Sequence, residues 1–252
     1  MTDSIALVPT MGALHAGHME LIRRARELSP EVVVSIFVNP LQFESNSDLE
    51  SYPRDLVGDT EKALAAGATR VWAPTYQEIY PTEIAKISAG RLGEIFEGRE
   101  RVGHFDGVLT VVNRLFEIVK PDYAIFGEKD FQQLFIVKNW VRENDVPVQI
   151  IAVPTVRDSD SLALSSRNVR LSPAARKSAL VIHRALQSAS KDEMLQELAS
   201  EPAFDLDYAE IIDEENFEVA GANTRLRRGV IAGWVDGVRL IDNMPMQTFE
   251  GE

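Results

Sequence analysis

The sequence predicts an α/β protein in which a doubly wound parallel sheet precedes a smaller α+β domain. Up to about residue 153, short apolar, β-branched runs alternate with segments of helical periodicity, as they do in βαβ units. Beyond that point a polar loop, a long helix and an acidic stretch replace the alternation. We therefore expect one domain over residues 1–155 and a second over residues 156–252.

The first domain is expected to contain five strands and four main helices. The run at 32–38 is nearly all apolar, which is typical of a strand buried on both faces of a parallel sheet. Expected strands are 5–9, 32–38, 71–74, 123–126 and 148–153. Expected helices, where apolar residues recur at helical spacing, are 15–28, 55–66, 104–119 and 131–143.

The second domain is expected to begin with a polar loop over 157–168 and a long helix from Pro173 to about Ser190. Two short strands are expected near 230–232 and 239–242. Turns are predicted at Gly229 and at the Asp-Gly pair 236–237. Strands and a helix in separate runs are typical of an α+β arrangement.

Composition limits the compartment and the partners. The 252 residues are 45% hydrophobic and include no cysteine, which excludes disulfides and thiolate metal sites and fits a reducing compartment. No apolar run approaches the roughly 18 residues of a membrane helix, and no signal peptide is recognisable. The sequence therefore predicts a cytoplasmic protein without a membrane partner.

The acidic charge is concentrated in one segment. The formal net charge is −13, and residues 191–218 contain eleven acidic side chains but only one basic side chain, that of Lys191. We interpret this segment as a solvated acidic face. Because such a surface repels phosphate backbones, we expect small-molecule substrates and no nucleic-acid partner.

A first polar cluster, PTMGALHAGH at 9–18, links the first strand to the first helix. His15 and His18 are three residues apart, so both project from one turn. The N–H groups at a helix start suit phosphate, and imidazoles there can donate hydrogen bonds as charge builds up in a transition state. A single histidine at this place is usually only a cap. The pair directly after a buried strand favours a role in phosphate chemistry.

Two further clusters follow the second and fourth strands. Asn39 and Gln42 can recognise hydroxyl or carboxylate groups without adding charge, although Asn-Pro alone is merely a turn. Lys129 is a point charge suited to phosphate, and Gln133 falls in the first turn of the next helix. Asp130 is equally explained as a helix cap. Because ligands of open α/β sheets bind beyond the carboxyl ends of the strands, these groups are expected to share one crevice.

A fourth cluster, LALSSRN at 162–168, places two hydroxyls and an arginine on a loop at the expected domain junction. Serine-rich loops are common, so this cluster alone is weak evidence. A loop at a junction can nevertheless close over a site and hold anionic oxygens.

With these clusters in hand, the chain resembles the pantothenate synthetase family, also called pantoate–β-alanine ligases. The resemblance covers nearly the whole sequence, and several spaced blocks in order are far more specific than any one. The blocks are PTMGALHAGH at 9–18, VSIFVNPLQF at 34–43, GHFDG at 103–107, FGEKDFQQ at 126–133, LALSSRN at 162–168 and RLIDN at 239–243. The resemblance implies a Rossmann-like fold of the nucleotidylyltransferase type, a C-terminal lid domain and a homodimer.

The resemblance also implies the reaction. Pantoate and ATP would form pantoyl adenylate and pyrophosphate, and β-alanine would then attack the acyl group to give pantothenate and AMP. Mg²⁺ accompanies ATP in this family. A carboxylate that attacks phosphorus needs cationic groups around the phosphate oxygens rather than a strong base. No base for the amine step is evident, which leaves that step open.

Site residues carry over by position. The resemblance implies catalytic roles for His15, His18 and Lys129. Pantoate binding falls on Gln42 and Gln133, with Gln42 also near β-alanine, while Arg101 and His104 match a pair around the active site. The implied ATP contacts are Met11, Gly12, Ala13, Leu14, His15, Ala16, Gly17, His18, Gly127, Glu128, Lys129, Asp130, Val156, Leu164, Ser165, Ser166 and Arg167.

Some features depart from the family pattern or stay unassigned. Ser161 stands where the family usually has glycine, which would stiffen or reshape the closing loop. The helical extension that often precedes the first strand is missing, and the acidic part of the second domain is short. We prefer to interpret Asp59 as an ordinary exposed helix acid rather than a Mg²⁺ ligand, so no metal ligand is assigned.

Three alternative interpretations share part of these features. Other nucleotidyltransferases with the HxGH pattern, such as phosphopantetheine or nicotinamide-nucleotide adenylyltransferases, lack the NPLQF and EKDFQQ pairing. A class I aminoacyl-tRNA synthetase would need a basic surface and further domains. A nucleotide-binding regulator without turnover would need ATP contacts but not both glutamines, and the histidine pair with Lys129 argues against it.

Overall fold

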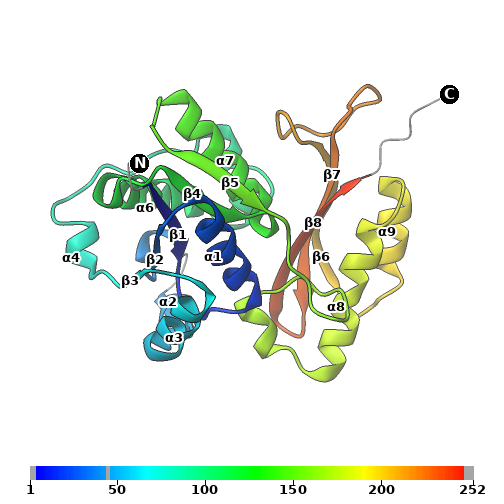
Figure 1. The fold of residues 1–252 in the computed structure, drawn as a ribbon. Coiled ribbons are helices and arrows are strands. Elements are labelled where there is room, and N and C mark those ends of the chain that lie inside the picture. The colour runs from blue at the N-terminus through cyan, green and yellow to red at the C-terminus, as the bar shows by residue number, and fades with distance from the viewer. Residues whose placement is uncertain (1–3, 44–45, 247–252) are drawn as a thin grey trace. The chain divides into compact units, whose positions relative to one another are not determined.

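The structure is a computed structural model that describes residues 4–43 and 46–246 (Figure 1). The chain forms two compact units. The first runs to Glu128 and also takes in Gln132–Pro154, whereas the second comprises Lys129–Phe131 and the chain from Thr155 onward. Each unit has its own sheet, one with five strands and one with three.

The sheet of the first unit is parallel throughout, which confirms the predicted α/β class. Its order is β3-β2-β1-β4-β5, so the winding reverses between β1 and β4. Ligands of such sheets bind beyond the carboxyl ends of the strands at this switch point. The strands are β1 (Ile5–Thr10), β2 (Glu31–Ile36), β3 (Arg70–Trp72), β4 (Tyr123–Gly127) and β5 (Gln149–Val153).

The four predicted helices are present with ends within one residue of those expected. They are α1 (Ala16–Leu28), α3 (Leu56–Ala66), α6 (His104–Val119) and α7 (Phe131–Glu143). Asp55 caps α3 by accepting from the Gly58 N–H at 3.0 Å, and Gly67 ends it with a φ of 114°. Three short helices were not expected, namely α2 (Asn46–Ser51), α4 (Tyr76–Ile79) and α5 (Glu97–Glu100).

Both faces of this sheet are buried. Figure 1 shows α1 across one face, where Ile22 and Ala25 pack with Val8 and Val34 in one apolar cluster. Alternate strand residues such as Leu7 point to the opposite face and are equally buried, and α6 packs against β1. Burial on two faces explains why the strands are continuous apolar runs rather than alternating ones.

The second unit is an antiparallel meander with two helices packed on it. Its strands follow the order β6-β7-β8, and Leu186, Met194, Ile231 and Leu240 lie in its core cluster. The elements are α8 (Pro173–Leu186), α9 (Lys191–Ala199), β6 (Asp205–Asp213), β7 (Arg227–Val235) and β8 (Val238–Met246).

The second unit corrects several sequence predictions. The strands β7 and β8 are nine residues long, β6 was not expected, and the long helix ends at Leu186. Gly229 lies inside β7 rather than in a turn; a Cβ there would meet the Leu186 side chain at 2.9 Å, so glycine allows the helix to pack closely. The predicted turn at Asp236 and Gly237 is confirmed, with φ values of 50° and 72°.

The acidic segment is less solvated than expected, because several of its carboxylates pair with basic side chains. Arg184 contacts Glu197 at 2.6 Å, and Lys191 contacts Glu210 at 2.6 Å. Further pairs are Arg239–Asp207 and Arg228–Glu214. Acidic side chains disfavour strands in isolation, so these pairs and the buried face of β6 explain a strand that propensity did not predict.

Candidate active site

The loop between β1 and α1 has a backbone that requires glycine at one position. Gly12 has a φ of 85°, and Ala13 follows with a φ of 52°. A Cβ on Gly12 would lie 2.9 Å from the Asp59 carboxylate and 3.2 Å from Ile36. Glycine is therefore needed here both for its conformation and for the close approach of α3.

Asp59 of α3 holds this loop. Its two carboxylate oxygens accept hydrogen bonds from the N–H groups of Ala13 and Leu14, each at 2.7 Å, and the residue is only 1% exposed. Lys62, one turn further on, donates to the Leu14 carbonyl at 3.2 Å. The interpretation of Asp59 as an exposed helix acid is therefore wrong. Both oxygens are used by the backbone, so the carboxylate orients the loop.

A sequence signal for Asp59 does exist. It lies four residues before Ala63, which is fully buried, so the two share the inward face of α3. A carboxylate on an apolar helix face needs partners, and the nearest unsatisfied donors are the N–H groups that precede α1.

The two histidines form a reciprocal cap at the start of α1. Nδ1 of His15 accepts from the Gly17 N–H, and Nδ1 of His18 accepts from the His15 N–H, both at 3.2 Å. When an imidazole is neutral and its Nδ1 accepts, its proton resides on Nε2. The caps thus fix the tautomer of both rings, whose centroids are 4.1 Å apart. Both rings carry an Nε2–H donor at the switch-point end of α1.

Gln42 belongs to a network of neutral polar groups that follows β2. Its Oε1 accepts from Asn39 at 3.1 Å, and its Nε2 lies 3.1 Å from the Met11 sulfur. Asn39 also donates to the Gly107 carbonyl and accepts from the Tyr80 hydroxyl, both at 3.0 Å. Burial raises the pKa of the Tyr80 phenol, which keeps it a neutral donor. The amide nitrogen and oxygen of Asn39 are therefore both hydrogen-bonded within the protein, whereas the Gln42 amide nitrogen donates only to sulfur, a weak acceptor.

His104 connects this network to α6. Its Nδ1 lies 2.9 Å from the Gln42 carbonyl, and its Nε2 lies 3.0 Å from the Arg101 guanidinium. A guanidinium can only donate, so Nε2 of His104 accepts and Nδ1 carries the proton that goes to the carbonyl. Arg101 and His104 thus support the backbone of Gln42. Gly107 allows the same segment to approach, because a Cβ there would lie 2.2 Å from the Leu41 carbonyl oxygen.

The two adjacent glutamines of α7 have different roles. Gln132 is buried and fully occupied: its amide donates to the Leu92 and Ile95 carbonyls, each at 2.8 Å, and accepts from the Glu97 N–H. Gln133 is half-buried, and its side chain makes no hydrogen bond with the residues that the structure describes. Of the pair, only Gln133 has a side-chain amide without a partner among the described residues, and its role in pantoate binding stays a prediction.

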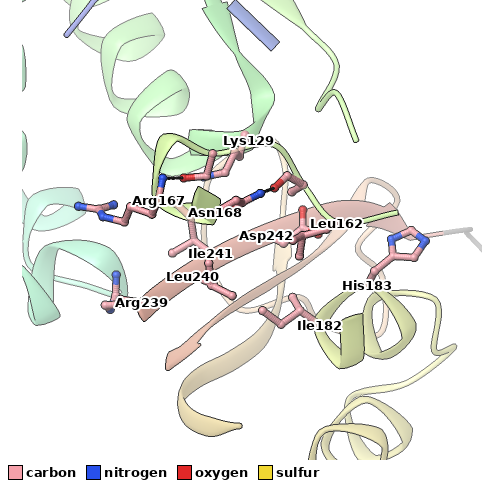
Figure 2. Close-up of a pocket in the computed structure, with 12 residues that line it drawn as sticks. Lys129, Leu162, Arg167, Asn168, Ile182, His183, Arg239, Leu240, Ile241 and Asp242 are labelled. Carbon is pink, nitrogen blue, oxygen red and sulfur yellow. Dashed lines mark hydrogen bonds between the residues drawn. The ribbon is translucent and has the colours of Figure 1, made fainter. Parts of the chain in front are cut away.

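Within the second unit, Lys129 lines a pocket with five residues of the fourth sequence cluster, among them Ser165 and Arg167 (Figure 2). Ser165 caps the short helix η4 (Ser166–Arg170) by accepting from the Arg167 N–H at 3.2 Å. An ammonium, a hydroxyl and a guanidinium on one pocket are suited to an anionic ligand. The structure thus brings three residues with predicted ATP contacts to one pocket, and their binding of phosphate stays a prediction.

The remaining predicted residues of this loop shape it. The Leu164 N–H donates to the Val156 carbonyl at 3.0 Å, and the backbones of Arg157 and Ala163 form an antiparallel β-bridge. Residues 156–164 therefore form a tight hairpin. At its tip Ser161 has a φ of 74°, a conformation that favours glycine. The departure that the sequence showed at this position is therefore a local backbone strain.

The hairpin tip is held by a charged clamp. Arg176 of α8 contacts both Asp158 and Asp160, at 2.6 and 2.7 Å. The hydrogen bond from Arg176 holds the pKa of Asp160 below its ordinary value of 3.8. This clamp was not expected from the sequence, because its partners are 16 to 18 residues apart.

Four polar residues of the pocket had no site role predicted from the sequence, although three of them lie within the matching blocks: Asn168, His183, Arg239 and Asp242. Nδ1 of His183 and Oδ1 of Asn168 are buried and have no hydrogen-bond partner among the described residues. Burial and the nearby Arg157 lower the pKa of His183, with Asp242 opposing the shift. His183 therefore favours its neutral form.

Across residues 4–43 and 46–246, no cluster of three or more histidine, aspartate or glutamate side chains is arranged to hold a metal ion. In the same ranges, no helix has the length and apolar character needed to cross a membrane.

Comparisons with known proteins agree over almost the whole chain. A family model described as pantoate-beta-alanine ligase matches residues 1–245. The pantothenate synthetase of Acidothermus cellulolyticus is 46% identical over 263 residues, covering 98% of this chain and 87% of that protein. That of Moorella thermoacetica is 44% identical over 258 residues, covering 97% of this chain and 91% of that protein.

Solved structures give the same result. The crystal structure of pantothenate synthetase from Thermus thermophilus matches with a TM-score of 0.91 at 43% identity, covering 96% of this chain and 92% of that one. A pantoate-beta-alanine ligase from Francisella tularensis, complexed with beta-gamma ATP and beta-alanine, matches with a TM-score of 0.84 at 35% identity. That match covers 98% of this chain and 91% of the other.

Proposed function

The chain belongs to the pantoate–β-alanine ligase family, and from this premise we propose that it condenses pantoate with β-alanine through a pantoyl-adenylate intermediate. The complex of the Francisella relative supports ATP and β-alanine as substrates here. The observation that carries the proposal is the reciprocal cap of His15 and His18, because it assigns the proton of each neutral ring to Nε2 at the switch-point end of α1.

In the first step, a carboxylate oxygen of pantoate forms a bond to the α-phosphorus of ATP, and the bond from that phosphorus to the bridging oxygen breaks. Pyrophosphate leaves with that electron pair, and no proton needs to be removed. Negative charge accumulates on the phosphate oxygens, which hydrogen-bond donors stabilise more in the transition state than in the ground state. The fixed Nε2–H groups of His15 and His18 and the Lys129 ammonium supply such donors in this proposal.

The proposed ATP contacts follow the family assignment in both units. In the first unit they are Met11, Gly12, Ala13, Leu14, His15, Ala16, Gly17, His18, Gly127 and Glu128. In the second unit they are Lys129, Asp130, Val156, Leu164, Ser165, Ser166 and Arg167. Support comes from the position of the histidine pair at the N-terminus of α1, where the helix dipole favours an anion, and from the cationic pocket of Lys129 and Arg167.

Gln42 and Gln133 are the proposed ligands of pantoate. The Gln133 side chain makes no hydrogen bond with the described residues, and the Gln42 amide donates to a sulfur atom, which is a weaker acceptor than a substrate oxygen. Neutral amides hold the hydroxyl and carboxylate groups of pantoate without repelling the carboxylate or reducing its nucleophilicity.

In the second step, the neutral amine of β-alanine attacks the acyl carbon and the bond from that carbon to the adenylate oxygen breaks. AMP leaves, and the amine loses a proton to water or to a phosphate group; we assign no side chain to this transfer. Mg²⁺ fits best as an ion brought by the ATP phosphates, because such ions usually keep substrate phosphates and waters as ligands.

Three further parts of the proposal concern the whole protein. We propose a nucleotide- and pantoate-binding domain over 1–155, a lid domain over 156–252, and a cytoplasmic homodimer. Light scattering on the purified protein tests the dimer, with an expected mass of twice 28.1 kDa.

Isotope exchange tests the first step. Labelled pyrophosphate should enter ATP when pantoate is present, and should not do so with amino acids or nicotinate mononucleotide in its place. Exchange that needs no pantoate, or no exchange at all, would contradict the proposal.

Oxygen labelling tests the intermediate. Pantoate labelled with ¹⁸O in its carboxylate should transfer one label to AMP for each pantothenate formed. Label found in inorganic phosphate together with ADP would instead indicate an acyl phosphate, and the adenylate would be wrong.

A further inference from the structure

We propose that Asn243 and Asp242, adjacent on β8, are positioning residues: Asn243 sets the place of Lys129, and Asp242 sets the place of the loop that carries Ser165 and Arg167. This inference rests on the proposed function of those residues in ATP binding. It assigns a role to the RLIDN run, which the reaction itself leaves without one.

Asn243 holds the backbone of Lys129. Its Nδ2 donates to the Lys129 carbonyl at 2.8 Å across 114 residues of sequence, and the residue is only 4% exposed. Its Oδ1 accepts from the Arg228 guanidinium at 2.6 Å. Both the nitrogen and the oxygen of the Asn243 amide are thus hydrogen-bonded, so the side chain has one orientation. The backbone from which the Lys129 side chain extends is therefore held in place.

Arg228 also supports the chain two residues after Lys129, at Phe131. Its guanidinium lies 4.0 Å from the ring centroid of Phe131, and Phe131 stacks on Phe217 at 6.0 Å. The short segment 128–130 therefore has one anchor at the Lys129 carbonyl and another at Phe131. A flexible lysine side chain gains accuracy only if its backbone is held in this way.

Asp242 holds the loop by a second route. Its carboxylate makes a paired contact with Arg157, at 2.6 and 3.0 Å, and is 5% exposed. Arg157 in turn donates to the Ser161 carbonyl at 3.2 Å, inside the hairpin that leads to Ser165. Figure 2 shows Lys129 and Arg167 beside the strand that carries Asp242.

The two routes meet on two consecutive residues. The Asn243 N–H donates to Asp242 Oδ1 at 2.8 Å, and Arg157 lies 3.4 Å from the Asn243 carbonyl. Two segments with proposed phosphate contacts, that of Lys129 and that of Ser165 and Arg167, are far apart in sequence. Both are therefore held by the same two residues, Asp242 and Asn243. The chemistry depends on placement to within about 1 Å, for which losses near a hundredfold are typical.

Asn243→Asp is the first test, because it keeps an acceptor for Arg228 and removes the donor to Lys129. We expect pyrophosphate exchange to fall about 10- to 100-fold, mainly in kcat, with the melting temperature close to that of the wild type. Asn144→Asp is the matched control: Asn144 also donates to a backbone carbonyl, that of Trp140, at 2.8 Å, but lies at the exposed end of α7. Its exchange rate should be unchanged.

A double-mutant cycle separates positioning from general damage. If Asn243 acts through Lys129, Asn243→Asp should cost less than about threefold in a Lys129→Ala background, measured with enzyme in excess of substrate. The same full loss in both backgrounds would overturn the proposal, as would an Asn243→Asp variant with wild-type exchange. If Asn243→Asp does not fold, Asn243→Ala carries the same cycle, since it removes the donor without adding charge.

Asp242→Asn tests the second route by weakening the contact with Arg157. Its loss should be coupled to Arg167→Ala and not to Lys129→Ala; the reverse pattern would overturn the assignment of Asp242. Failure of the proposed function is distinguishable, because then the wild type itself shows no pantoate-dependent exchange. An unaffected Lys129→Ala would instead refute the role of Lys129.

Discussion

The histidine loop of the first unit and the Lys129 segment of the second both carry side chains with proposed phosphate contacts, but their backbones are held in place by different kinds of hydrogen bond. In the loop that carries His15 and His18, the two imidazoles accept from N–H groups of the loop itself, and Asp59, about 46 residues away, accepts from two more. The Lys129 segment is oriented by Asn243, 114 residues away. Short-range caps are encoded within a motif, whereas a long-range tether depends on the completed fold. The two regions should therefore respond differently to substitution.

Of the substitutions considered for these two regions, His18→Ala should give the largest loss of pyrophosphate exchange. It removes a transition-state donor, so pyrophosphate exchange should fall about 10²- to 10³-fold. It also removes the acceptor for the His15 N–H, which should cost only about 1 kcal/mol of unfolding free energy. Exchange assays and urea unfolding measure the two effects. Glu20→Ala, on the exposed side of the same helix, is the control; a His18→Ala protein that fails to fold would mean that the histidine is structural.

Asp59→Asn probes a long-range contact of the histidine loop. An amide cannot accept from both Ala13 and Leu14 as the carboxylate does, so a buried N–H is left without a partner, at about 1–3 kcal/mol. Displacement of the loop should also reduce exchange by about tenfold or more. Asp55→Asn, which keeps the cap of the same helix, should change neither quantity.

Magnesium dependence adds a second measurement to Asp59→Asn. Because the carboxylate is occupied by backbone N–H groups, raising the Mg²⁺ concentration should not restore the activity. Recovery at high Mg²⁺ would show that Asp59 is a metal ligand after all.

His183→Gln tests the second unit through pH. The pKa of His183 is lowered below its ordinary value of 6.5, so the unfolded chain binds this proton more readily than the folded one. Stability should therefore fall as pH drops below about 6.5, and stability above that pH should not depend on this group. Unfolding free energies between pH 5 and 7.5 should show a weaker slope for the variant. Identical slopes would mean that His183 is not the group responsible.

Ser161→Gly should give the smallest effect. It relieves a non-glycine φ of 74° at the hairpin tip, worth about 1 kcal/mol, which corresponds to about 2–4 °C in melting temperature for a chain of this size. Ser159→Gly, two residues earlier and without a positive φ, should bring no gain. A lower melting temperature for Ser161→Gly would show that the serine stabilises the turn.

Sequence reasoning succeeded where the determinants are local. The strands and helices of the first unit follow from apolar runs, caps and breakers, and α6 and α7 have the predicted ends. The motif around His15 and His18 lies at the carboxyl end of β1, as expected. The second unit was less predictable, because β6 is rich in acidic residues and becomes a strand only through pairing with β7 and contacts such as Arg239–Asp207.

The positions of supporting groups were the least predictable part of the site. The sequence predicts an exposed Asp59 and shows Asn243 only as part of a matching run, because the partner of Asn243 is a backbone carbonyl that no pattern identifies. Gln132 and Gln133 are adjacent and identical in type, yet only the structure shows that Gln132 is occupied by three backbone groups. Identity of a residue type indicates possible chemistry, and contacts decide which residues are free for it.

The membership of Lys129–Phe131 in the second unit has a consequence for recombining this protein with its relatives. A chimera joined at residue 154 would take the lysine from one parent and its amide tether, Asn243, from the other. Such a hybrid would place the ammonium group correctly only if the C-terminal parent has an asparagine at this position and presents it at hydrogen-bond distance from the Lys129 carbonyl. Chimeras that exchange the C-terminal part should therefore exchange residues 129–131 with it. The hydrogen bonds that hold these residues belong to the second unit, although the residues lie within the first part of the chain.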